Sequence, residues 1–152
     1  MFLLKVVKSF KAFGVRYALV GGYAVSLHGA VRGTLDIDVV IDWSKESFDK
    51  AQQALNAIGL TSRLPLNPAE VFSFREEYIA NRNLFAWGFV NKNNPSEIVD
   101  IVLTENLKKM KTKKVTVQGQ RIEIVSKTDL IRIKSKAGRE QDKLDVIALN
   151  KL

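Results

Sequence analysis

The stretch that decides the fold is Leu35–Asp42, which reads LDIDVVID. Apolar and acidic residues alternate along it at a period of two, which is typical of a β-strand whose faces meet different surroundings. We therefore predict a strand over Leu35–Ile41. Asp36 and Asp38 share one face of this strand. The opposite face is apolar and carries Leu35, Ile37, Val39 and Ile41.

The spacing of Asp36 and Asp38 suggests a metal site. Two carboxylates two residues apart on a strand stand about 7 Å apart at Cα, so their charges repel and burial of either is costly. A divalent cation removes both problems, and Mg²⁺, with Mn²⁺ as an alternative, suits oxygen ligands better than zinc does. The other interpretation is an edge strand with a solvated acidic face, which is the commoner outcome for a bare Asp-x-Asp pattern.

A glycine pair precedes this strand. Tyr17–Val20 is a short apolar run that predicts a buried strand, and it ends in Gly21 and Gly22. A short helix is expected next, over Tyr23–Leu27. Glycine lets backbone N–H groups approach a phosphate closely, and the N-terminus of the next helix favours the same negative charge. By itself, however, a Gly-Gly pair predicts only a turn.

A third acid lies inside a later apolar run. Asp100 interrupts Ile98–Val102, where a strand with one buried face is expected to carry an apolar or neutral residue. If this strand lies beside that of Asp36 and Asp38, three carboxylates converge, and such a group can hold two metal ions for in-line phosphoryl transfer. A salt bridge from Asp100 to a lysine or arginine is the alternative.

The rest of the chain alternates between helical and strand patterns. Apolar spacing and composition predict helices over residues 3–13, 45–58, 69–80, 128–137 and 139–149. Strands are expected over 84–90, 97–103, 113–117 and 120–125, forming two hairpins. This order predicts an α+β fold, with a mixed β-sheet, helices packed on one face and two C-terminal helices. We expect one domain over residues 1–152, with a catalytic core of about residues 1–125 and closing helices over about 126–152.

The charge of the chain is unevenly distributed. Lysine and arginine outnumber aspartate and glutamate by 24 to 16, which gives a net charge of +8. Residues 1–100 carry a net charge of +1, whereas residues 101–152 carry +7. A basic final third favours a polyanionic partner such as nucleic acid or a nucleotide, with solubility as the plain alternative.

Composition also excludes several function classes. The chain has no cysteine, so it has no disulfide framework, thiolate zinc site or cysteine nucleophile. Its single histidine, His28, cannot by itself build a histidine metal site or a catalytic triad, and we expect it to pack or hydrogen-bond behind the glycine turn. The lack of cysteine suits a reducing compartment, so we expect a cytoplasmic protein. No segment approaches the roughly 20 apolar residues of a membrane span, so we expect no membrane partner.

Taken together, these residues resemble a known signature. Val20–Gly22, a spacer, Asp36–Val39 and the later Asp100 are similar to the pattern of the nucleotidyltransferase superfamily with the DNA polymerase beta-like fold. The string Gly21–Asp38 and the tail Leu130–Val146 more closely resemble small stand-alone bacterial nucleotidyltransferases related to abortive-infection toxins. The resemblance spans nearly the whole chain.

The resemblance implies a reaction and a set of catalytic residues. The reaction is transfer of a nucleoside monophosphate from an NTP, such as ATP, to an acceptor hydroxyl, with release of pyrophosphate. Asp36, Asp38 and Asp100 would be the catalytic carboxylates that bind Mg²⁺. Asp100 would also act as the base toward the acceptor hydroxyl.

The same resemblance implies nucleotide contacts. Gly21 and Gly22 would cradle the phosphates, and Lys134 is a candidate for contacting the triphosphate, although a solvated helix lysine is an equal interpretation. The neighbouring Arg139, Asp142 and Asp145 are read as easily as ion pairs on a helix surface, which contribute little individually.

The acceptor and the partners are open at this point. RNA, a protein or a small molecule could accept the nucleotide, and the +7 net charge of residues 101–152 modestly favours RNA. Because the chain has room for only two closing helices, acceptor recognition could come from a partner protein or a second copy. The alternative function is a catalytically silent module that binds RNA or a partner protein, in a setting such as a toxin-antitoxin pair. The three retained carboxylates argue against it.

Overall fold

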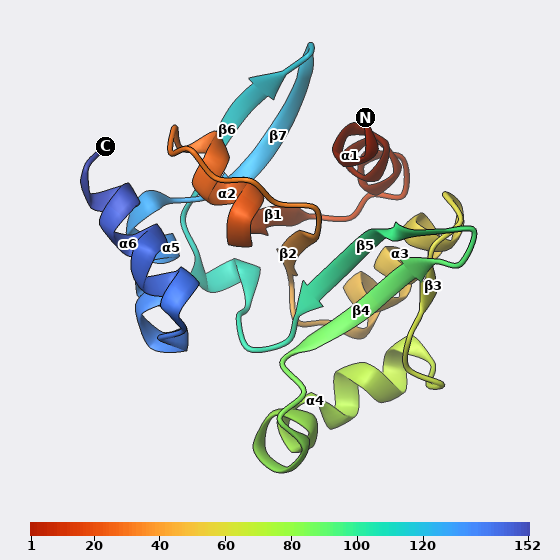
Figure 1. The fold of residues 1–152 in the computed structure, drawn as a ribbon. Coiled ribbons are helices and arrows are strands. Elements are labelled where there is room, and N and C mark those ends of the chain that lie inside the picture. The colour runs from red at the N-terminus through yellow and green to blue at the C-terminus, as the bar shows by residue number, and fades with distance from the viewer.

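A computed structural model, which describes residues 1–152, shows a mixed β-sheet flanked by helices (Figure 1). The sheet has seven strands in the order β3-β4-β5-β2-β1-β7-β6. The strands are β1 (Tyr17–Val20), β2 (Ile37–Ile41), β3 (Thr61–Ser62), β4 (Ala86–Asn91), β5 (Asn94–Val102), β6 (Thr112–Val117) and β7 (Gln120–Val125). The helices are α1 (Phe2–Ala12), α2 (Gly21–Leu27), α3 (Lys45–Asn56), α4 (Pro68–Arg82), the short 3-10 helix η1 (Leu107–Lys109), α5 (Lys127–Ala137) and α6 (Glu140–Asn150). The expected α+β class is confirmed.

Parallel pairing in the middle of the sheet brings distant segments together. Strand β2 pairs in parallel with β5 and antiparallel with β1, and β1 pairs in parallel with β7. The pairs β4–β5 and β6–β7 are the two expected antiparallel hairpins. The strand that carries the Asp-x-Asp pattern therefore lies directly beside the strand of Asp100.

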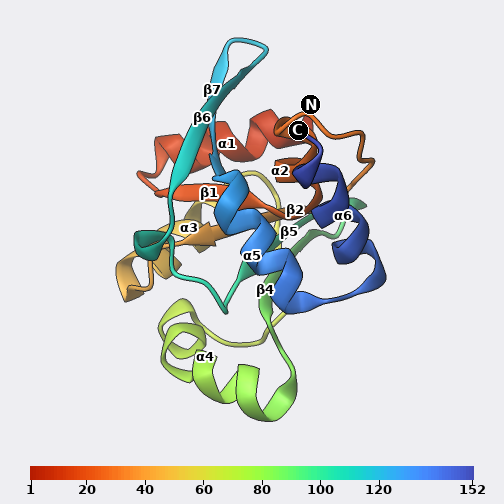
Figure 2. The same cartoon turned by 90° about the vertical axis from the view of Figure 1, so that its left-hand side faces the viewer.

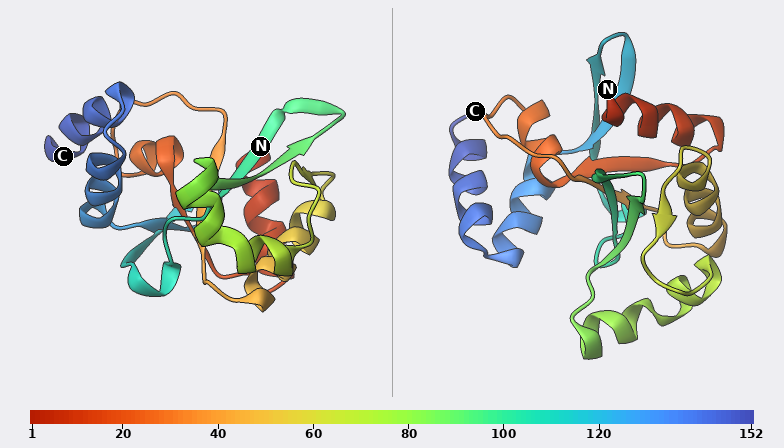
Figure 3. Two further views of the ribbon diagram at one scale, coloured as in Figure 1. Left: turned by 90° about the horizontal axis from the view of Figure 1, so that it is seen from below. Right: turned by 45° about the vertical axis from the view of Figure 1, so that its right-hand side comes forward.

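Helices cover the central strands from two sides (Figures 2 and 3), so the prediction that they pack on one face was wrong. Helices α1, α3 and α4 lie on one side, where α3 contacts both α1 and α4. Helix α2 and the two C-terminal helices lie on the other, and α5 contacts both α2 and α6. Because both sides are covered, all four residues of β1 are buried. None of the helices is both long enough and apolar enough to cross a membrane.

A single hydrophobic cluster of 33 buried residues joins the helices to the sheet. Within it, the ring of Phe48 on α3 stacks on Trp87 of β4 with centroids 5.6 Å apart, and Trp87 contacts Phe89 at 4.7 Å. Aromatic pairs of this kind contribute about 0.5–1.5 kcal/mol beyond the area that they bury. This packing anchors β4, and through it β5, against helix α3.

Local capping signals explain where several helices begin. Ser44 accepts a hydrogen bond from the backbone N–H of Ser47, which satisfies one of the free N–H groups at the start of α3. Helix α4 begins with Pro68 inside a reciprocal capping box formed by Asn67 and Glu70. These signals lie in the sequence itself, which is why the helix positions could be predicted closely.

The strand predicted over Leu35–Ile41 begins later than expected. Strand β2 starts at Ile37, so Asp36 lies in the preceding loop, and Leu35 is 73% exposed instead of facing the core. The reason is tertiary: Nε of Arg32 lies 3.0 Å from the carboxylate of Asp145 on α6, which anchors the loop to the C-terminal helices.

Two further boundaries differ from the prediction. Helix α2 begins at Gly21 rather than at Tyr23, so the glycine pair forms its first turn. Strand β4 begins at Ala86, and Phe85, expected within the strand, is 51% exposed at its end. Both differences place residues at the edge of one cleft, which Gly21, Gly22 and Phe85 help to line.

Candidate active site

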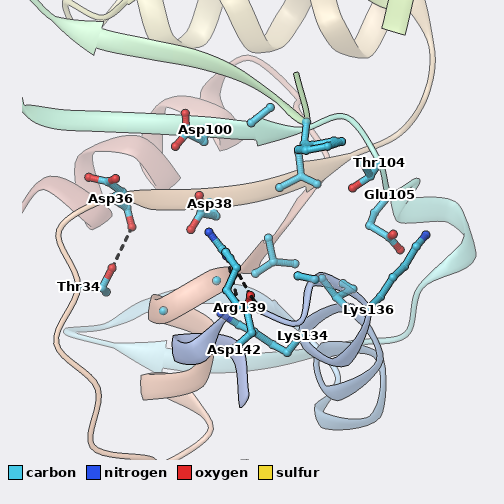
Figure 4. A pocket seen from close by; sticks show the side chains of 18 of the residues that line it. Thr34, Asp36, Asp38, Asp100, Thr104, Glu105, Lys134, Lys136, Arg139 and Asp142 are labelled. Carbon is cyan, nitrogen blue, oxygen red and sulfur yellow. Dashed lines mark hydrogen bonds and ion pairs between the residues drawn. The ribbon is translucent and has the colours of Figure 1, made fainter. Parts of the chain in front are cut away.

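Asp38 of β2 and Asp100 of β5 lie directly opposite each other on neighbouring parallel strands. Figure 4 shows their side chains near one another at the wall of a single pocket. Asp100 forms no ion pair with a lysine or arginine, so the salt bridge considered as the alternative is absent. The two strands are adjacent, as the prediction required, and Asp38 and Asp100 therefore converge.

Asp36 completes the acidic group from the loop. It is exposed and directly precedes β2, and the hydroxyl of Thr34 donates a hydrogen bond of 3.4 Å to its backbone carbonyl (Figure 4). Its negative charge raises the pKa of both Asp38 and Asp100. The three predicted carboxylates are thus close enough to interact electrostatically.

The raised pKa values of Asp38 and Asp100 indicate that the negative charge at this site lacks a compensating cation. Burial, followed by the charges of Asp100 and Asp36, raises the pKa of Asp38 to about 7, although Lys134 and Arg139 act in the opposite direction. The pKa of Asp100 is also raised, first by burial and then by Asp36. Like charges held together in a partly buried site favour the protonated form unless a cation joins them.

The three carboxylates fit a hard divalent cation whose remaining coordination positions are filled by oxygen atoms of the substrate. No three His, Cys, Asp or Glu side chains are arranged so that they alone would surround one ion. Pairs of the three carboxylates remain, and Mg²⁺ is usually held by one or two protein carboxylates together with phosphate oxygens and waters. His28 does not line this cleft, and its Nε2 lies 2.7 Å from the backbone carbonyl of Val125, which agrees with the expected hydrogen bond behind the glycine turn.

The glycine turn packs directly against Asp38. Gly21 has a φ of +65°, and a Cβ at this position would overlap the carboxylate of Asp38. A Cβ on Gly22 would lie 2.8 Å from Cβ of Thr34, so this glycine lets the loop before β2 pack closely. Both glycines are therefore required by contacts made across the site, in addition to the turn that the sequence predicted.

Lys134 is at the cleft, but its ammonium group already has two partners. Its Nζ lies 3.2 Å from the carboxylate of Asp142 and 2.8 Å from that of Asp145, and the lysine side chain is 7% exposed. Arg139 donates to Asp142 at 2.7 Å, and Arg32 donates to Asp145 at 3.0 Å. Lys134 is thus neither a solvated helix lysine nor a free cation.

The interpretation of Asp142 and Asp145 as surface ion-pair partners was wrong. Their residues are 1% and 2% exposed, and both acids belong to a buried network that joins α5, α6 and the loop before β2. Hydrogen bonds from Arg139 and Lys134 lower the pKa of Asp142 in spite of its burial, and those from Lys134 and Gln141 do the same for Asp145. Helical spacing could not reveal this, because the face of α6 that meets α5 is a property of the tertiary packing.

Two residues beside Asp100 were missed by the sequence reasoning. Gly88 of β4 pairs with Asp100, and a Cβ there would lie 3.1 Å from Oδ1 of Asp100 and 3.2 Å from Cδ of Arg63. The positive charge of Arg63 lowers the pKa of Asp100, against the effect of burial. A glycine in the interior of a strand was the only available signal, because glycine there often marks a close approach.

These groups surround one cleft of about 780 Å³. Its wall combines the glycine turn and the three acids with residues from the segment after β5 and from the last two helices. The added residues, which the sequence did not single out, include Thr104, Glu105 and Lys136. Figure 4 shows Asp36, Asp38 and Asp100 on the sheet side, and Lys134, Lys136 and Arg139 on the helical side together with the paired Asp142. The cleft therefore has an acidic wall and a basic wall.

A mixed sheet that presents a glycine turn and opposed aspartates to one cleft defines a class of enzyme, and the chain is a nucleotidyltransferase. Within that superfamily, the chain belongs to the aminoglycoside-2″-adenylyltransferase family, whose model matches residues 2–149. None of the curated proteins compared with the chain matches it significantly. The finer resemblance to abortive-infection relatives stays a prediction.

Solved structures share the fold. The lincosamide antibiotic adenylyltransferase LnuA, bound to lincomycin, superposes with a TM-score of 0.66 at 16% identity, over 98% of this chain and 94% of LnuA. ANT(2″)-Ia in complex with adenylyl-2″-tobramycin gives a TM-score of 0.64 at 10% identity, over 97% of this chain and 84% of the other. An antigenic nucleotidyltransferase-like protein from Paracoccidioides brasiliensis gives 0.59 at 15% identity, over 97% and 74%.

Proposed function

We propose that the protein transfers a nucleoside monophosphate from an NTP to an acceptor hydroxyl in an Mg²⁺-dependent reaction that releases pyrophosphate. The observation that carries this proposal is the pair formed by Asp38 and Asp100, which lie opposite each other against the turn at Gly21. No other arrangement of acids in the chain combines partial burial with raised pKa values at a cleft. ATP is the donor to test first, since the family takes its name from adenylyl transfer.

Asp36, Asp38 and Asp100 would hold the metal. Bound there, Mg²⁺ or Mn²⁺ would supply positive charge that neutralises the phosphate oxygens and the leaving pyrophosphate. In the protein itself, the parallel pairing of β2 and β5 sets the relative position of Asp38 and Asp100. The strands thereby hold the acids in place before substrate arrives, which avoids reorganisation during the reaction.

Asp100 is our candidate for the base. In the proposed step the acceptor oxygen forms a bond to the α-phosphorus, the bond between that phosphorus and the oxygen bridging to the β-phosphate breaks, and pyrophosphate leaves. The hydroxyl proton passes to the carboxylate of Asp100. Gly88 leaves one oxygen of this carboxylate uncrowded by a side chain, and the charge of Arg63 favours its ionised form, in which it can accept a proton.

The nucleotide phosphates would lie between the glycine turn and the basic wall. Gly21 and Gly22 line the cleft beside Asp38, so their backbone N–H groups are our candidates for contacting the phosphates. Lys134 has three N–H donors, of which Asp142 accepts one, and its ammonium group also lies 2.8 Å from Asp145, so a donor remains for a triphosphate oxygen. The exposed Lys136 and Arg139 line the same wall and are further candidates.

The pairing of charged side chains in the cleft indicates which charge the acceptor carries. A polycationic acceptor needs free carboxylates, but Glu105 is paired with Arg132 at 2.9 Å and Asp142 is paired with Lys134 and Arg139. The remaining acids are the three that would hold the metal. We therefore infer that the acceptor hydroxyl belongs to a neutral or anionic compound, and that a small molecule of this kind is preferred over an aminoglycoside with several amino groups.

The proposal is tested by incubating the protein with each NTP labelled at the α-phosphate, with Mg²⁺, Mn²⁺ or EDTA, and with panels of neutral, anionic and polycationic hydroxyl compounds, RNA and protein. Transfer should require metal and should fall roughly a hundredfold or more in Asp38→Asn and Asp100→Asn. Asp49→Asn, a change to an exposed acid on α3, is the matched control and should leave transfer intact. Equal transfer by the wild type and the Asp38 and Asp100 variants would overturn the proposal, and preferential transfer to aminoglycosides would overturn the inference on the acceptor.

A further inference from the structure

The β6–β7 hairpin projects away from the rest of the molecule. It forms one end of the sheet, and Figures 1 and 2 show its tip extending beyond the helices and away from the α5–α6 side of the cleft. Six ladder pairs join its strands, from Thr112 opposite Val125 to Val117 opposite Gln120. The hairpin is therefore a regular two-stranded ribbon whose outer part contacts little else.

The ribbon and the segment leading into it carry a concentration of positive charge. Residues 108–127, which we call the basic arm, contain seven lysines and arginines and a single acid. The seven cations are Lys108, Lys109, Lys111, Lys113, Lys114, Arg121 and Lys127, and all are exposed. None of them forms an ion pair. Lys127 donates a hydrogen bond of 3.2 Å to the main-chain oxygen of Leu152, and the other six side chains form no hydrogen bond. Most of the +7 net charge of the final third thus lies in the basic arm.

The one acid of the basic arm does not neutralise it. Glu123 lies opposite Lys114 in the ladder, but its carboxylate accepts a hydrogen bond of 3.0 Å from the hydroxyl of Thr112. The adjacent Lys113 and Lys114 point to opposite faces of the strand, because side chains alternate along it. Positive charge therefore surrounds the ribbon, which suits a long anionic ligand better than a single small anion.

The side chains of the basic arm favour a phosphate backbone over a membrane surface or unpaired bases. None of the large exposed hydrophobic residues of the protein lies in residues 108–127, so a membrane surface would find no apolar anchor there. The arm has no aromatic residue either, so it cannot stack on unpaired bases. Lysines, with the exposed Thr116, are groups that bind phosphate oxygens without reading sequence.

We propose that the basic arm is a docking surface for the phosphodiester backbone of a nucleic acid, bound without sequence preference. This surface is separate from the catalytic cleft and does not depend on the proposed reaction. It assigns the basic final third of the chain to a macromolecular partner, whereas the nucleotide would be handled by the few cations of the cleft.

The test uses the full chain and fluorescence anisotropy with short duplex RNA, duplex DNA and single-stranded RNA across a series of salt concentrations. The arm variant combines Lys113→Gln, Lys114→Gln and Arg121→Gln. The matched control combines Lys45→Gln, Arg82→Gln and Lys92→Gln, which removes the same charge from exposed positions that form no ion pair and lie outside the arm.

Each lost phosphate contact should reduce the slope of log K against log salt by about 0.7 to 0.9, so the arm variant should lose about 2 to 3 from the slope and roughly a hundredfold in affinity near 0.1 M salt. The control should retain the wild-type slope. Equal losses in both variants would show a net-charge effect and overturn the proposal. Tighter binding to anionic lipid vesicles than to any nucleic acid, or no nucleic-acid binding at low salt, would also overturn it.

Comparison of the three nucleic acids shows whether RNA or DNA supplies the backbone. Transfer to a small acceptor tests the proposed function separately, and the arm variant should keep this activity.

Discussion

The ammonium group of Lys134 on α5 lies 2.8 Å from the carboxylate of Asp145 on α6, and both side chains are nearly fully buried. A buried ion pair gives little net stability over an apolar pair, but removal of one partner leaves an uncompensated charge in a poor solvent for it. Here a single lysine is shared by two acids, since Asp142 lies 3.2 Å from the same nitrogen, and the only other cations beside them are the less buried Arg139 and Arg32. This contact connects the end of the chain to the wall of the cleft.

We therefore expect Lys134→Met to lower the free energy of unfolding by about 3–5 kcal/mol, because Asp142 and Asp145 would lose their shared cation. Urea denaturation measures the change. Lys143→Met breaks the exposed contact with Glu140 and should cost less than about 1 kcal/mol. Adding Asp145→Asn to Lys134→Met should recover part of the loss. A cost for Lys134→Met as small as that of the surface control would contradict the role given to this network.

Gly21→Ala should abolish most transfer activity. Alanine is strained at a φ of +65°, and its Cβ would overlap the carboxylate of Asp38, so the acid must move. Gly119→Ala is the matched control, because its φ is +79° and a Cβ there meets nothing within 4 Å. Both variants should lose about 1–2 kcal/mol of stability from backbone strain, measured by thermal or urea unfolding. Only Gly21→Ala should also lose transfer, and similar activity in the two variants would refute this account.

Gly88→Ala should displace the carboxylate of Asp100 and lower kcat, with little effect on the stability of the fold. The backbone at Gly88 is ordinary, but a Cβ there would lie 3.1 Å from Oδ1 of Asp100 and 3.2 Å from Cδ of Arg63, so the carboxylate or the arginine must shift. We expect about a tenfold loss of kcat with a stability change near 1 kcal/mol. Adding Arg63→Ala should relieve the crowding on one side and reveal whether the shift of Asp100 is responsible. An unchanged kcat for Gly88→Ala would remove the basis for this argument.

Metal-free protein should become less stable as the pH rises from about 4 to about 7. Because the pKa of Asp38 is raised to about 7 in the folded state, the folded protein binds more protons than the unfolded chain in this window, and stability falls as those protons leave. Asp100 acts in the same direction. The lowered pKa values of Asp142 and Asp145 act below about pH 4, outside the window.

The measurement is thermal unfolding in EDTA across this range, for the wild type and for Asp38→Asn. A raised pKa of this size corresponds to at most about 4 kcal/mol at pH 8, so Asp38→Asn should be more stable than the wild type there and nearly equal to it at pH 4. Mg²⁺ should stabilise the wild type more at pH 8 than at pH 5. If Asp38→Asn follows the same pH dependence as the wild type, another group is responsible.

Much of the fold follows from local patterns. The alternation in Leu35–Asp42 predicts a strand, and Ser44 marks the start of α3 at the observed residue, while composition placed the start of α4 one residue late. These signals act over a few residues, so they survive whatever the rest of the chain does. The edges of the cleft were less predictable, because Asp36 leaves the strand for a loop that Arg32 anchors to Asp145.

The sequence by itself determined the chemistry that is available: three acids in strand-like runs, a glycine pair, no cysteine and a basic final third. Only the tertiary structure decided which of these groups meet. Parallel pairing placed Asp100 beside Asp38, and the packing of α6 on α5 turned Asp142 and Asp145 inward to Lys134. Residue types and local periodicity are properties of neighbours in the chain. The meeting of carboxylates from distant strands depends on burying a common core, which no single segment specifies.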